Sequence, residues 1–135
     1  MSKSEVKSKS KVKSASAEVG EYLGKLFAFN SSLKLYHWHV TGKSSYSQHI
    51  ALDQAIGDLL DNTDRLVETS YALFGDLDIV IPETERPEDI VAHATDFYAY
   101  AEQGRELFTE AFTQAIIDDY VEAIQQLRYR LIRLQ

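Results

Sequence analysis

The sequence predicts an all-α protein built as a four-helix bundle. Apolar residues recur in steps of three and four over four long stretches, which is the spacing of one face of a helix. No stretch alternates as a strand does, and the chain holds only two prolines, Pro82 and Pro87. A length of 135 residues allows one domain with one core. We therefore expect a Lys/Ser-rich tail over residues 1–14 and a bundle over residues 15–135.

The first two helices are predicted on either side of a short loop. The first begins near Glu18 and ends at Gly42, because a glycine commonly follows the last turn of a helix. Its stripe consists of Val19, Leu23, Leu26, Asn30, Leu33, His37 and Val40. Ser47 is expected to cap the second helix, which runs to about Phe74. The stripe of the second helix consists of Leu52, Ile56, Leu59, Thr63, Leu66 and Val67.

A connection from Gly75 to Arg86 follows, and it is long enough to cross the bundle. Its apolar residues 79–81 fit either a short helix or an extended stretch. Pro87 suits the first turn of a third helix. The apolar face of that helix is Val91, Ala94, Tyr98, Ala101, Phe108 and Phe112. Asp118 or Asp119 is expected to cap the fourth helix. The fourth stripe is Val121, Ile124, Leu127, Leu131 and Leu134.

Composition limits the chemistry and the location. The chain has no cysteine, so nitrogen and oxygen atoms would have to hold any metal. The net charge of −7 divides into +4 over residues 1–16 and −11 over the rest. The basic end carries Lys3, Lys7, Lys9, Lys11 and Lys13. The first twenty residues contain no apolar run, so we expect no signal peptide, no membrane anchor and a cytoplasmic protein.

Five residues of metal-ligand type stand at informative spacings: His37, His49, Asp53, Asp64 and Glu68. His49 and Asp53 share a helix face, and so do Asp64 and Glu68, because each pair is four residues apart. The second pair follows the first by 15 residues, or about 22 Å of helix, so no single ion touches both. The chain therefore carries two incomplete sites, or two antiparallel copies complete each other's site across a two-fold axis.

Two imidazoles with carboxylates suit divalent iron and leave room for an oxidant. Each residue taken alone also fits a structural or solvated role. Arg65, between Asp64 and Glu68, allows a surface ion network instead of a metal site.

The stretch His37-Trp38-His39-Val40-Thr41-Gly42, followed by His49-x-x-x-Asp53 and Asp64-x-x-x-Glu68, resembles the ferroxidase signature of the Dps family. Members of this family are mini-ferritins, or DNA-binding proteins from starved cells. The resemblance implies a ferritin-like bundle with a long crossover between its second and third helices. It also implies a hollow shell of twelve subunits that oxidises Fe(II) with hydrogen peroxide or oxygen. The shell stores the ferric iron and so protects DNA from oxidative damage. In that family His37 and His49 of one chain would meet Asp64 and Glu68 of a two-fold partner, with Asp53 close by as a further ligand.

Several residues keep two interpretations. Trp38 lies beside the site or in the core, and His39, which stands where the family commonly has Asn, is a ligand or a bystander. His93 is structural or exposed. Asp118, Asp119 and Glu122 line a pore for Fe(II), as the resemblance implies, or cap a helix.

The five lysines can bind DNA phosphates without reading sequence, and the resemblance implies the same activity. The acidic body opposes it, and the tail can instead simply keep the particle soluble. The alternative function is a structural DNA-binding or particle-forming protein of the same fold with little ferroxidase activity. A third possibility is a four-helix adaptor whose His and Asp residues are incidental.

Overall fold

The computed structural model describes residues 14–135 as four α-helices and one short 3-10 turn. The helices are α2 (Ala15–His39), α3 (Ser45–Phe74), α4 (Ile90–Gln103) and α5 (Ala111–Leu134), with η1 (Gly104–Leu107) after α4. No strand occurs within residues 14–135, which confirms the all-α prediction. The five lysines of the predicted tail lie outside the described residues. None of the helices in residues 14–135 is long and apolar enough to cross a membrane.

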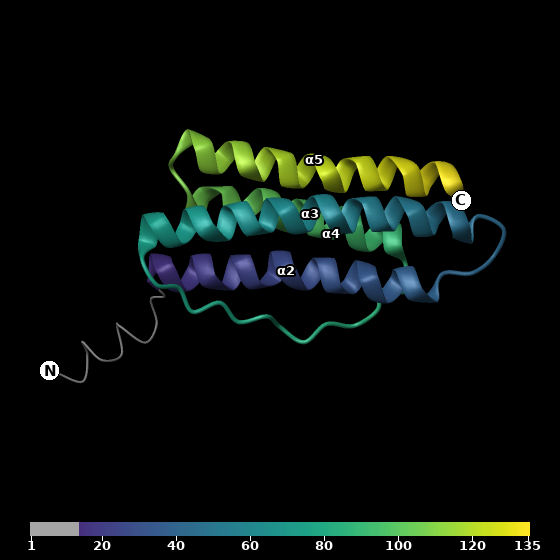
Figure 1. Cartoon of the computed structure of the whole chain (residues 1–135), viewed down its shortest axis with the longest axis horizontal. Helices are drawn as coiled ribbons and strands as arrows, with labels where there is room; N and C mark the ends of the chain where they lie inside the picture. Colours follow the sequence, from purple (N-terminus) through teal and green to yellow (C-terminus); the bar gives the residue numbers. More distant parts are fainter. Residues whose placement is uncertain (1–13) are drawn as a thin grey trace, which may run out of the picture.

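The helices form a bundle in which α2 contacts α3 and α4, and α5 contacts the same two helices (Figure 1). α2 and α3 are antiparallel, and so are α4 and α5. Residues 75–89, which we call the strap, run the length of the bundle beside α2, so that α3 and α4 point the same way. The strap contains no helix, which decides the open question about residues 79–81 in favour of an extended stretch.

The strap lies against two glycines of α2. A Cβ atom at Gly20 would lie 2.5 Å from the carbonyl oxygen of Asp78, and one at Gly24 only 2.0 Å from that of Val80. Both distances are too short for real contacts, so any larger residue would push the strap away. Only glycine therefore lets the strap pack this closely on α2.

The predicted ends of the first two helices differ from the observed ones by a few residues. Ser14 caps α2 by accepting a hydrogen bond from the backbone of Ala17. α2 ends at His39, and Gly42 lies in the following turn with φ of 102°. α3 already begins at Ser45, so Ser47 lies inside it and is not its cap.

The predicted starts of the last two helices are wrong for a physical reason in each case. Pro87 precedes α4, because the side chain of Asp89 accepts a hydrogen bond from Ala92 and begins the helix at Ile90. α5 begins at Ala111, before Asp118 and Asp119, so neither aspartate caps it. Phe112 belongs to α5 rather than to the third helix and is mostly exposed.

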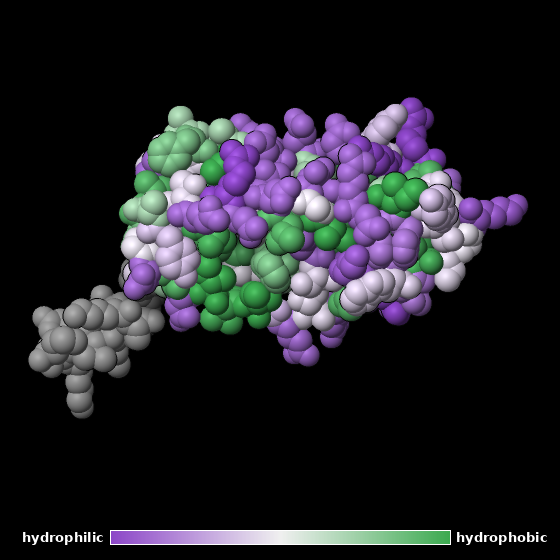
Figure 2. Space-filling model, in the orientation of Figure 1, coloured by the Kyte–Doolittle hydropathy of each residue, from purple (hydrophilic) through white to green (hydrophobic). Residues whose placement is uncertain are grey.

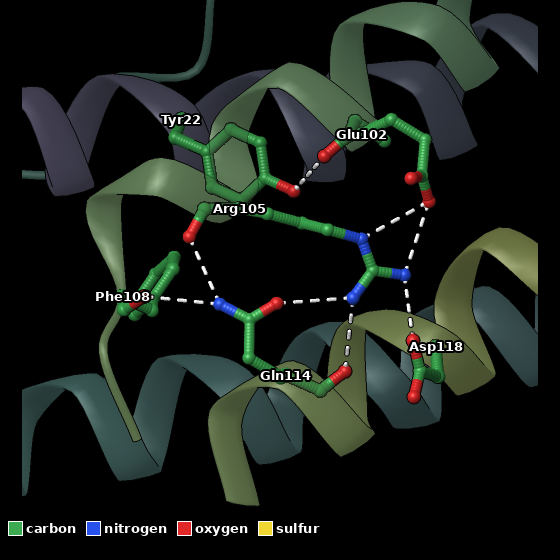
Figure 3. A network of polar contacts seen from close by, with 7 residues as sticks. Tyr22, Glu102, Arg105, Phe108, Gln114 and Asp118 are labelled. Carbon is green, nitrogen blue, oxygen red and sulfur yellow. Dashed lines mark hydrogen bonds and ion pairs between the residues drawn. The ribbon is translucent and has the colours of Figure 1, made fainter. Parts of the chain in front are cut away.

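A polar network around Arg105 fixes where α5 begins (Figure 3). The guanidinium group donates to the Glu102 carboxylate at 3.0 Å, pairs with Asp118 at 2.6 Å and donates to the side-chain oxygen of Gln114 at 3.0 Å. The side-chain amide of Gln114 donates back to the carbonyl oxygens of Arg105 and Phe108. These contacts tie the end of α4 to the first turns of α5, and they give Asp118 a structural role.

Candidate metal centre

The turn between α2 and α3 brings His37 and His49 together. His37 lies in the last turn of α2 and His49 in the first turns of α3. Their rings stack with centroids 3.5 Å apart and planes inclined by 24°. His37 is only 5% exposed, whereas His49 is half-buried. The sequence prediction that these two imidazoles meet is therefore consistent with the structure.

Asp53 completes what we call the histidine half-site: His37, His49 and Asp53. Its Oδ1 atom lies 2.9 Å from Nε2 of His37. Desolvation raises the pKa of this carboxyl, but the hydrogen bonds and charges of His37 and Lys34 outweigh it, so the pKa lies below its ordinary value. Asp53 is thus held as a carboxylate, which is the form that binds metal.

The half-site supplies imidazole nitrogens and a carboxylate, which are ligand types that divalent metals bind. Nδ1 of His37 has no hydrogen-bond partner within residues 14–135, although the ring is buried, and Nε2 contacts Oδ1 of Asp53. A buried polar atom without a partner is costly, and a metal ion is one way to satisfy it. Two neighbouring ligands of an octahedral ion, with bonds of about 2.1 Å, stand about 3.0 Å apart. The 2.9 Å between Nε2 of His37 and Oδ1 of Asp53 is close to that spacing, and it is also the length of an ordinary hydrogen bond.

Lys34 and Trp38 border the half-site. The Lys34 ammonium lies 3.3 Å from Oδ1 of Asp53 and 5.9 Å from the centre of the Trp38 ring. Trp38 is 67% exposed, so it is not a core aromatic, and its place beside a metal site stays a prediction. Sequence reasoning missed Lys34. The spacing of three residues between Lys34 and His37 could have identified it, because this spacing places both side chains on one side of α2.

Asp64 and Glu68, which we call the carboxylate half-site, lie further along α3. Both are exposed, and neither pairs with any residue between 14 and 135. The predicted network with Arg65 does not form, because Arg65 turns to Asp119 on α5 at 3.3 Å. Within the described residues, no group of three or more His, Asp or Glu is arranged to hold a metal ion. A single chain therefore presents two separate sets of candidate ligands.

The remaining candidates lie elsewhere. His39 is exposed and its Nδ1 atom is 3.1 Å from Arg86. His93 is half-buried, with Nε2 2.7 Å from the hydroxyl of Ser32 and its ring 5.2 Å from that of Phe29, so it is structural. Glu122 lies with Asp119 beside a shallow groove between α3 and α5.

One family model matches the chain, over residues 37–131. It is described as a family of unknown function, DUF5856. The matched region spans the histidine half-site, the carboxylate half-site, the strap, α4 and most of α5. No curated protein and no solved structure matches the chain.

Proposed function

We propose that this chain, which belongs to the DUF5856 family of unknown function, is a ferritin-like protein. In this proposal it oxidises Fe(II) at sites shared by two antiparallel copies and stores the ferric product. The observation that carries the proposal is the buried His37 ring, which stacks on His49 and contacts Asp53 while its Nδ1 atom has no hydrogen-bond partner in residues 14–135. The carboxylates of Asp64 and Glu68, which pair with no residue between 14 and 135, supply the complementary half.

The spacing along α3 supports a two-fold arrangement. The crossing stripe, as we call it, consists of His49, Asp53, Gly57, Leu60, Asp64 and Glu68. Its steps of three and four keep it on one side of the helix. The midpoints of the pairs His49–Glu68, Asp53–Asp64 and Gly57–Leu60 all fall between residues 58 and 59. Two α3 helices crossing antiparallel at that point would set each histidine half-site against the partner's carboxylate half-site, once on each side of the axis.

The centre of the crossing stripe suits a close helix contact. A Cβ atom at Gly57 would have no other atom of the described chain within 4 Å, so the chain itself leaves this place open. Leu60, one turn further on, is 38% exposed, although it is a large apolar residue. In the antiparallel arrangement the partner's Leu60 lies over Gly57, which gives a reason for both residues. Apolar residues also gather on part of the face seen in Figure 2, and the strap exposes two of them, Val80 and Ile81.

The chemistry requires no residue beyond the two half-sites. Two Fe(II) ions each give up one electron, and the two electrons break the O–O bond of one hydrogen peroxide molecule. Hydrolysis of the two ferric ions with two further waters yields two FeOOH units and releases four protons. Imidazoles bind the ferrous reactant, and carboxylates favour the more highly charged product. Since both electrons leave together, no hydroxyl radical is formed.

The first experiment is anaerobic loading with Fe(II), followed by hydrogen peroxide, with ferric absorbance recorded over time. We expect fast oxidation by the wild-type protein and loss of the fast phase in a His37→Ala/His49→Ala variant. His39→Ala is the matched control, because His39 is an exposed histidine of the same helix turn. Circular dichroism verifies that each variant keeps its helices. Equal slow oxidation by all three proteins would contradict the ferroxidase proposal and favour a structural particle.

A mixing experiment tests whether the site is shared. His49→Ala chains and Asp64→Ala chains are each expected to be inactive alone. A dimer of one chain of each kind retains one intact site, because the intact His49 and the intact Asp64 meet on one side of the axis only. Random mixing then restores about a quarter of the wild-type rate. No recovery in verified mixed dimers would overturn the two-chain arrangement.

Particle mass, measured by light scattering on the same samples, tests the shell. The resemblance to the Dps family leads us to expect twelve subunits. DNA binding through the five lysines also remains a proposal. It predicts a mobility shift of duplex DNA that disappears when residues 1–13 are deleted, while iron oxidation continues.

A further inference from the structure

Lys34 occupies an unusual place for a cation beside a metal site. It lies one turn before His37 in α2, and its ammonium lies 3.3 Å from Oδ1 of Asp53. Nε2 of His37 approaches the same oxygen atom at 2.9 Å. The carboxylate oxygen best placed to bind a metal with His37 therefore already has the positive charge of Lys34 next to it.

A bound ion and the Lys34 ammonium would repel each other. With a metal–oxygen bond of about 2.1 Å, an ion on Oδ1 can lie at most about 5.4 Å from the unmoved ammonium. Asp53 is 54% exposed, so solvent screens this repulsion, but two charges about 5 Å apart still lie within the screening length of physiological salt. The repulsion is also half as large again for a ferric ion as for a ferrous ion, since the charge rises from two to three.

The Lys34 ammonium also has an alternative position, away from Asp53. The Lys34 side chain is 38% exposed on a flexible stem. The face of Trp38 lies 5.9 Å from the ammonium and offers a favourable position for a cation. The lysine can thus leave Asp53 when an ion arrives and return when the ion departs.

We propose that Lys34 is a positioning residue that holds the Asp53 carboxylate as its counter-ion and competes with the metal for it. The competition weakens metal binding at the histidine half-site and disfavours the ferric product more than the ferrous substrate. A site that passes its product on to a store must release it, and Lys34 promotes that release. This inference rests on the proposed function, because it needs the half-site to bind metal.

The test is titration of the full chain with Co²⁺, which binds such ligands without being oxidised under anaerobic conditions. Isothermal calorimetry gives the affinity. The fluorescence of Trp38, the chain's only tryptophan, reports binding at this site. We expect Lys34→Met to bind Co²⁺ about tenfold more tightly than wild type, because a nearby positive charge has been removed. Lys34→Arg keeps the charge and is expected to bind like wild type.

Lys25→Met is the matched control. Lys25 lies in the same helix, pairs with Glu21 at 3.4 Å and lies 4.9 Å from the centre of the Tyr100 ring, but it is remote from Asp53. Its replacement is expected to leave Co²⁺ affinity unchanged. If wild type binds Co²⁺ and Lys34→Met binds it equally well or more weakly, the role proposed for Lys34 is wrong, but the proposed function is not contradicted. No Co²⁺ binding by any of the proteins would overturn this role and the proposed function together.

Discussion

Gly57 lies in the middle of α3, where a glycine weakens a helix by about 1 kcal/mol relative to alanine. Nothing in the described chain requires it. Its φ is not positive, and a Cβ atom there would meet no other atom within 4 Å. For a single chain, Gly57→Ala should therefore raise stability by about 0.5–1 kcal/mol, or the melting temperature by about 2–5 °C.

The two-chain proposal predicts a different outcome for a larger side chain. Helices that meet through small residues approach to about 8 Å, and a leucine at the crossing point takes the place of the partner's Leu60. Such overpacking typically costs about 1–3 kcal/mol, and the two-fold axis imposes it twice in every dimer. Gly57→Leu should therefore keep its helices but fall to smaller species, with loss of fast iron oxidation.

Light scattering gives the particle mass, and circular dichroism gives the helix content and melting temperature. Gln126→Leu is the control, because it adds the same side chain at an exposed position of α5. It should leave mass and oxidation unchanged. A Gly57→Leu protein of wild-type mass and wild-type oxidation rate would refute the crossing at residue 57.

Three further predictions concern the bundle itself. Gly24→Ala should lower the melting temperature, although alanine favours a helix more than glycine does. The added methyl group would lie 2.0 Å from the carbonyl oxygen of Val80 and displace the strap. The loss of strap packing outweighs the gain in helix stability of about 1 kcal/mol. His93→Gln should flatten the loss of thermal stability between pH 7 and pH 5. Burial lowers the pKa of His93 despite an opposing effect of Asp96, so the unfolded chain takes up this proton first and stability falls as pH drops below about 6.5. Arg105→Met should cost about 1–3 kcal/mol in urea unfolding, because it leaves partly buried carboxylate and amide groups without their donor.

Each of these has a matched control. Gly57→Ala tests the same substitution in a helix without a strap above it, and equal gains at both glycines would contradict the role given to Gly24. His39→Gln removes an exposed histidine, and an equally flattened pH profile there would contradict the burial argument. Arg133→Met removes an exposed arginine of α5, and an equal loss of stability would show that the network around Arg105 contributes nothing particular.

The helices were predictable from sequence because their signal is local. The apolar stripe that contains Leu23, Leu26 and Leu33 has helical spacing whatever it packs against, and all three are fully buried in the structure. The start of α5 was not predictable, because it depends on contacts that Gln114 makes with Arg105 and Phe108. The position of the strap was not predictable either. Gly20 and Gly24 permit its close contact with α2, but the sequence does not show which segment lies on them.

The same distinction applies to the candidate site. His37, His49 and Asp53 could be placed together because a short turn joins the ends of two antiparallel helices. Lys34 was missed because its partner Asp53 is 19 residues away and belongs to another helix. The absence of an ion pair between Arg65 and its neighbours Asp64 and Glu68 could not be foreseen either, since it depends on where α5 presents Asp119.

Three features of this chain lower the stability of a single copy, and the proposed dimer offers one explanation for all three. His37 buries an Nδ1 atom that has no hydrogen-bond partner in the described chain, at a cost of about 1–3 kcal/mol. Gly57 weakens α3 by about 1 kcal/mol without relieving any contact within the chain. Leu60 exposes apolar surface one turn away. In the proposed dimer, a second chain crossing at residues 58 and 59 would cover Leu60, use the space at Gly57 and bring carboxylates to His37 through a shared ion. A monomeric adaptor explains none of the three features. We therefore expect that a variant that no longer forms the large particle also loses its metal affinity.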